Sequence, residues 1–71
     1  MEEQLEDLQS RLNAISEELG DLSITVLRDA LEAGRSERPV LDKALSRIRR
    51  SVDKAAGLIE REALAMARTE T

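Results

Sequence analysis

The chain contains no cysteine, no histidine and no aromatic residue. Without cysteine it has no disulfide framework, no thiolate ligand and no thiol nucleophile. Without histidine it lacks the commonest metal ligand and the commonest general base. Without aromatic rings it lacks the side chains on which nucleic-acid bases stack. We therefore expect a protein that is not an enzyme, with no catalytic residue, no cofactor, no metal site and no small-molecule substrate.

Long apolar runs are missing as well. No run approaches the roughly 18 residues that a membrane-spanning helix needs. The start, Met1-Glu2-Glu3, is acidic and is not followed by the apolar segment of a signal peptide. These features predict a cytoplasmic chain without a membrane partner.

The chain is short but rich in helix-forming residues. Its 71 residues allow one small domain, and domains of this size often depend on metals, disulfides or oligomerisation. Because cysteine and histidine are absent, oligomerisation is the route that remains. Hydrophobic residues make up 41% and charged residues 37%, a mixture typical of long helices and coiled coils.

Two series of apolar residues predict two long helices. In each series, successive members are separated alternately by four and three residues, as at the a and d positions of a heptad repeat. The first series is Met1, Leu5, Leu8, Leu12, Ile15, Leu19, Leu22 and Val26. The second is Leu41, Leu45, Ile48, Val52, Ala55, Ile59, Glu62 and Met66, in which only Glu62 is not apolar.

The stretch between the two series predicts a turn. Gly34 suits the position just after a helix, and Pro39, the only proline, suits the beginning of the next helix. We expect a single domain over residues 1–71, with helix 1 over about 2–33, a turn over about 34–38 and helix 2 over about 38–68. A short connection makes the helices antiparallel neighbours, so the expected fold is all-α, a two-helix coiled-coil hairpin.

Some apolar residues lie outside the heptad series and predict an interface. They are Ile24, Leu27 and Leu31 in the first half, and Val40, Ala44 and Leu58 in the second. A lone hairpin has no third layer to cover such residues, and exposed apolar patches usually mark interfaces. We expect a second copy to cover them, which gives a homodimeric four-helix bundle. The alternatives are coverage by another protein and a patch that stays exposed.

Charge is distributed unevenly. Residues 1–34 carry nine acidic and two basic side chains, whereas residues 35–71 carry nine basic and six acidic ones. Arg47, Arg49 and Arg50 form a basic cluster that could contact nucleic-acid phosphates or an acidic surface on a partner protein. The acidic pI of about 4.8 and the missing aromatic residues argue against nucleic acid and favour a match to the acidic first helix, within the chain or between copies. Because the three arginines do not share one helix face, part of the cluster points outward, where an acidic surface on a partner protein could bind.

The segments LQSRLNAISEEL, VLRDAL and ERPV resemble the beginning of the all-helical chorismate mutases. That resemblance implies a long first helix with two active-site arginines, which Arg11 and Arg28 would match. The connecting stretch has no lysine where that family places a catalytic one, and the third helix of the family has no counterpart here.

Together these features predict a small adaptor, scaffold or regulator that binds itself and another protein. The two alternatives are an enzyme like the chorismate mutases and a nucleic-acid-associated protein that uses the basic cluster.

Overall fold

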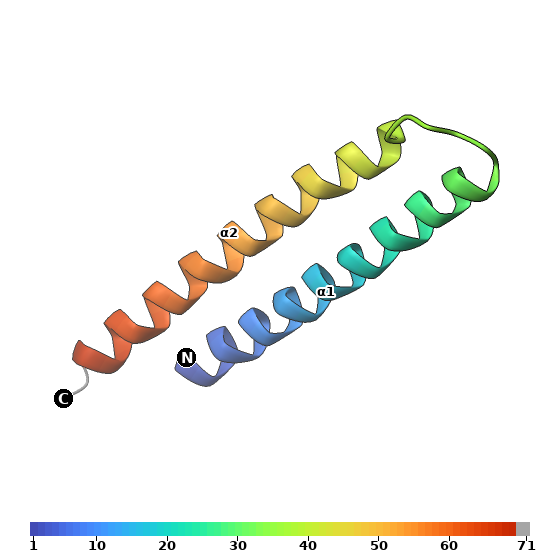
Figure 1. Ribbon diagram of the computed structural model, residues 1–71. Helices are drawn as coiled ribbons and strands as arrows, with labels where there is room; N and C mark the ends of the chain where they lie inside the picture. The colour runs from blue at the N-terminus through green and yellow to red at the C-terminus, as the bar shows by residue number, and fades with distance from the viewer. Residues whose placement is uncertain (70–71) are drawn as a thin grey trace.

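The computed structural model describes residues 1–69 as two antiparallel α-helices joined by one connection (Figure 1). Helix α1 spans Glu2–Glu32 and helix α2 spans Val40–Thr69, and they pack side by side along their length. The hairpin is elongated, with principal extents of 59 × 15 × 10 Å. The all-helical hairpin predicted from the sequence is confirmed. Residues 70–71 of the expected 1–71 domain lie outside the described residues.

The end of α1 is fixed by a glycine. Gly34 has a positive φ of 79°, a conformation that favours glycine because it has no Cβ. The Arg35 amide donates a hydrogen bond to the Ala30 carbonyl at 2.9 Å, and the Gly34 amide donates one to the Leu31 carbonyl at 3.0 Å. This pair of bonds is the Schellman arrangement, which satisfies carbonyls at the helix end and reverses the chain.

The beginning of α2 follows Pro39. The Lys43 amide donates to the Pro39 carbonyl at 3.3 Å, the first hydrogen bond of the helix. Proline has no amide hydrogen and a fixed φ, so it fits where a helix begins and its own amide would have no partner.

One position of each heptad forms the contact between the helices, as predicted. On α1 these residues are Leu5, Leu12, Leu19 and Val26, and on α2 they are Leu45, Val52, Ile59 and Met66. Leu45 is buried and the other seven are half-buried. We call these eight residues the central seam.

The other half of the heptad prediction is wrong except at Ala55, which is half-buried. On α1, residues at the second apolar position of each heptad, such as Ile15, face solvent. Ser16 lies between the helices instead, since Ile15 is 43% exposed but Ser16 only 6%. On α2 the same rotation occurs, because Ile48 is 48% exposed and Ala56 only 4%. On both helices the central seam is kept, and the second line of contacts lies one residue later in the chain than predicted, so each helix is rotated about its axis by roughly half of the 100° that one residue spans.

Small side chains and polar contacts account for this rotation. Ala30, Ala56 and Ala63 are buried between the helices, where small residues allow the backbones to approach closely. The rotation also buries Ser16 and Asp42, both of which form hydrogen bonds. As a consequence, none of the larger side chains in residues 1–69 is fully buried.

Candidate protein-interaction surfaces

One side of the hairpin carries large apolar side chains that the helix packing leaves uncovered. They are Leu8, Ile15 and Leu22 on α1, with Leu41 and Ile48 on α2, and each is more than 40% exposed. We call these five residues the apolar face.

Helix geometry places all five on the same side. Ile15 follows the seam residue Leu12 by three positions, and Ile48 follows the seam residue Leu45 by three. A step of three residues turns a helix by about 300°. Because the two helices run in opposite directions, this step points both side chains to the same side of the hairpin.

The opposite side carries a polar contact between the helices. The Ser16 hydroxyl donates a hydrogen bond to the Asp53 carboxylate at 2.6 Å and accepts one from Arg49 Nε at 3.1 Å. Gly20 makes room for the arginine, since a Cβ at this position would lie 3.0 Å from Arg49 Nη1. We call this side of the hairpin the polar face.

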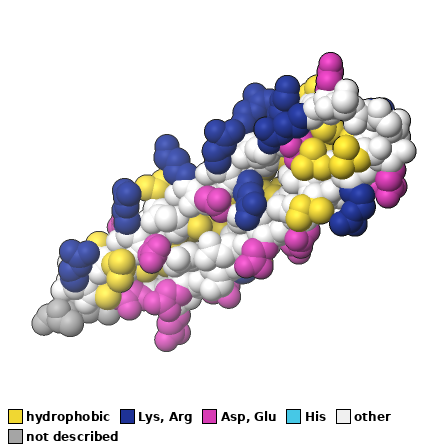
Figure 2. All heavy atoms as spheres, viewed as in Figure 1, with side chains coloured by type: hydrophobic (Ala, Val, Ile, Leu, Met, Phe, Trp, Pro, Cys, Tyr) yellow, Lys and Arg dark blue, Asp and Glu magenta, His cyan; other side chains and the backbone are white. Residues whose placement is uncertain are grey.

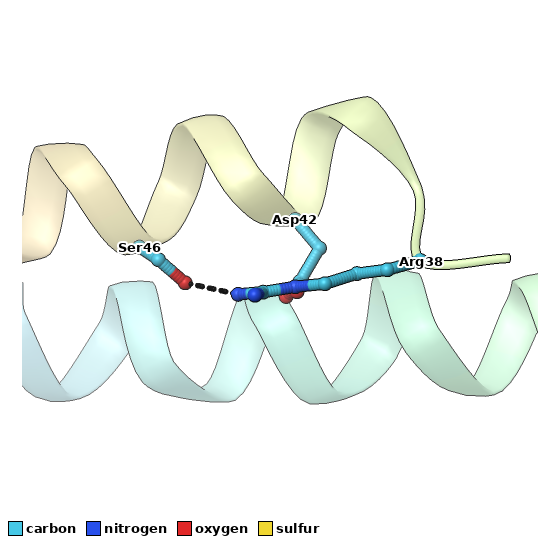
Figure 3. A network of polar contacts seen from close by, with 3 residues as sticks. All are labelled: Arg38, Asp42 and Ser46. Atoms are coloured by element: carbon cyan, nitrogen blue, oxygen red, sulfur yellow. Dashed lines mark hydrogen bonds and ion pairs between the residues drawn. The ribbon is translucent and has the colours of Figure 1, made fainter.

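A second polar cluster lies at the beginning of α2. Arg38 folds back along the helix, and its guanidinium donates to the Asp42 carboxylate and, at 2.7 Å, to the Ser46 hydroxyl (Figure 3). Asp42 is only 3% exposed, and it lies in the first turn of α2, where the helix dipole stabilises a negative charge. The spacing of Arg38, Asp42 and Ser46 at intervals of four residues was a signal in the sequence, but the periodicity of apolar residues does not reveal it.

Three of the six predicted interface residues lie beside this cluster. Ile24, Leu27 and Leu31 are exposed and line an open groove together with Arg38 and Asp42. Figure 2 shows hydrophobic side chains gathered near the turn on the face in view. This groove is on the polar side of the hairpin, since Arg49 and Ser46 also line it.

The other three predicted interface residues lie elsewhere. Val40 lines a separate hollow with Leu41 and Val26. Ala44 is half-buried and Leu58 is exposed. Helical spacing places Ala44 and Leu58 beside the stripe of Leu41 and Ile48, at the margin of the apolar face. The structure thus distributes the six residues over the groove, this hollow and the margin of the apolar face, and their role as an interface stays a prediction.

The basic cluster is also divided. Arg49 reaches across to Ser16 on the polar face. Arg50 donates to the Ser46 carbonyl at 3.4 Å, and both Arg47 and Arg50 are exposed. The three arginines therefore do not form one continuous surface, and contact with nucleic acid or with an acidic partner stays a prediction.

The structure does not bring together the arginines singled out by the resemblance to chorismate mutases. Arg11 and Arg28 lie on the same helix, 17 residues apart, which at 1.5 Å per residue is about 25 Å. Arg11 forms an exposed ion pair with Asp7 at 3.5 Å. Arg11 lines a shallow hollow with Asp7 and Leu8, and Arg28 does not line that hollow.

In the described part of the chain, no three acidic side chains are grouped closely enough to hold a metal ion. Neither α1 nor α2 is long and apolar enough to cross a membrane.

Comparison of the chain with protein-family models, with curated proteins and with solved structures gave no significant match.

Proposed function

We propose that this chain is a small, non-enzymatic protein-interaction module that works by self-association and by binding another protein. Its cellular role would be that of an adaptor, a scaffold or a regulator. The apolar face supports this proposal, because five aliphatic side chains on one side of a short hairpin remain about half exposed.

The energetics of the hairpin favour a covering partner. Full burial of one aliphatic side chain contributes about 1.5–3 kcal/mol, so covering the exposed halves of five would contribute on the order of 5 kcal/mol per copy. Among residues 1–69, the buried apolar residues are Leu45 and three alanines. A core of this size stabilises a 71-residue chain weakly, and association adds what the hairpin lacks.

The same pattern is typical of helices in larger bundles. A helix that packs against one neighbour buries two positions of each heptad, whereas a helix in a four-helix bundle buries a third position as well. The apolar face would supply this third position on both helices, which supports the four-helix bundle as the assembled form.

The proposal is tested by measuring mass and thermal stability against protein concentration. We expect sedimentation equilibrium to give the mass of a dimer, and the melting temperature, followed by circular dichroism, to rise with concentration, since association stabilises the folded state by mass action. A monomer mass with a melting temperature independent of concentration would contradict it.

A further inference from the structure

We infer that two copies associate through their apolar faces in one particular arrangement. The α1 helix of each copy packs against α2 of the other, and the two turns lie at the same end of the bundle. This inference rests on the proposed self-association and adds the surface that mediates it and the orientation of the second copy.

The two halves of the apolar face differ in the size of their side chains. On α1 the face consists of Leu8, Ile15 and Leu22, which are all large. On α2, Leu41 and Ile48 are bordered by the small residues Ala44, Ser51 and Ala55 at helical spacings of three and four. Large side chains pack best against small ones, so α1 fits α2 of a second copy better than it fits another α1.

Symmetry leaves two ways to join the faces by a two-fold axis. If the axis runs along the helices, α1 lies against the partner's α2 and the turns are at the same end. If the axis runs across the helices, α1 lies against the partner's α1 and the turns are at opposite ends.

Charge distinguishes the two arrangements. Helix α1 carries nine acidic and two basic residues, a net charge of −7, whereas α2 carries seven basic and four acidic residues, a net charge of +3. Figure 2 shows acidic side chains along α1 and basic side chains along α2. Packing α1 on α1 would bring two acidic helices together, and packing α1 on α2 joins opposite charges.

The same arrangement gives Glu62 a partner. Glu62 continues the heptad stripe of Leu41 and Ile48, and it is exposed. Since Ser16 contacts Asp53, Glu62 lies at about the level of Asp7, one turn from Arg11. Within its own chain Arg11 pairs with Asp7. When the turns are at the same end, the partner's Glu62 lies at the level of Asp7 and Arg11, and Arg11 can form a second ion pair with it. When the turns are at opposite ends, the partner's Glu62 lies at the other end of the bundle.

The orientation can be measured with one label per chain. The chain has no cysteine, so Ser36→Cys gives a single site in the turn for a nitroxide label. Pulsed electron paramagnetic resonance then measures the distance between the two labels of a dimer. Neighbouring helices lie 8–10 Å apart, and each label projects outward from its turn. We therefore expect about 20–30 Å between the two labels when the turns are together. Turns at opposite ends would separate the labels by roughly the 59 Å length of the hairpin.

Each result has one meaning. A dimer mass with the short distance supports the arrangement. A dimer mass with the long distance overturns it and leaves self-association intact. A monomer mass for both labelled and unlabelled chains overturns the arrangement together with the proposed function.

A charge exchange tests the proposed ion pair independently. Arg11→Glu and Glu62→Arg are each expected to weaken dimerisation about threefold, and the double variant to restore it to within about twofold. The measured quantity is the dimer dissociation constant, to which an ion pair within one chain contributes little. If the effects of the two single changes simply add in the double variant, the contact between Arg11 and the partner's Glu62 is absent and the proposed ion pair is overturned.

Discussion

The two sides of this hairpin differ in which side chains they bury and which they leave exposed. On the polar face, hydrogen bonds of the buried Ser16 join the two helices, and the buried Asp42 is bonded to Arg38 at the beginning of α2. The apolar face holds larger side chains, yet Ile15 and Ile48 remain nearly half exposed. Burial of serine and aspartate beside exposed isoleucine supports the proposed further layer of packing, since hydrophobic side chains gain most from burial.

The largest effect that separates the two sides is expected from paired aspartates. Ile15→Asp with Ile48→Asp places two charges in the centre of the apolar face. We expect the dimer dissociation constant to rise on the order of 100-fold, because two apolar contacts are lost and two charges would have to be buried. Sedimentation equilibrium measures this change, and circular dichroism shows whether the chain stays helical.

The matched control is Leu27→Asp with Leu31→Asp in the groove beside the turn. These residues are also exposed leucines, and we expect this variant to keep the mass of the unmodified chain. If the groove pair dissociates the dimer and the apolar-face pair does not, the interface is the one predicted from the sequence, with Leu27 and Leu31 in it, and the apolar face is not where the copies meet.

The sequence predicted the helices and the turn because local residues determine them. Gly34 supplies the positive φ that reverses the chain, and Pro39 immediately precedes α2. The central seam was also predictable, since Leu12 and Leu45 stand at a heptad position that any packing of these helices would bury.

The rotation of the helices could not be predicted from periodicity. A seam through Ile15 and a seam through Ser16 differ by one residue, and an apolar count favours isoleucine. The choice depends on contacts between helices, namely the Ser16 bonds to Asp53 and Arg49 and the small residues that permit a close approach. These contacts join residues that are far apart in the sequence, so the spacing of apolar residues along each helix could not predict them.

A smaller effect is expected on the polar face, from Asp42→Ala. The change removes a buried carboxylate, its hydrogen bond from Arg38 and its favourable position in the first turn of α2. We expect a loss of about 1–2 kcal/mol in the free energy of unfolding, because Arg38 is half exposed and water can solvate it after the change. Urea unfolding at one fixed protein concentration measures the difference.

The control for Asp42 is an acid on the same helix that faces solvent. Glu60→Ala removes an exposed carboxylate, and we expect it to alter the free energy of unfolding by less than about 0.5 kcal/mol. Equal losses in the two variants would show that the cluster of Arg38, Asp42 and Ser46 does not stabilise the fold.

The smallest effect compares two glycines within the helices. Glycine costs a helix about 1 kcal/mol relative to alanine, so Gly57→Ala is expected to stabilise the chain by up to that amount, since nothing lies within 4 Å of the added Cβ. At Gly20 the new methyl group would meet the Arg49 guanidinium at 3.0 Å. Moving Arg49 weakens its bond to Ser16, so Gly20→Ala should gain less than Gly57→Ala. Urea unfolding of the two variants checks the order, and an equal gain at both sites would mean that Arg49 does not hold the polar face together.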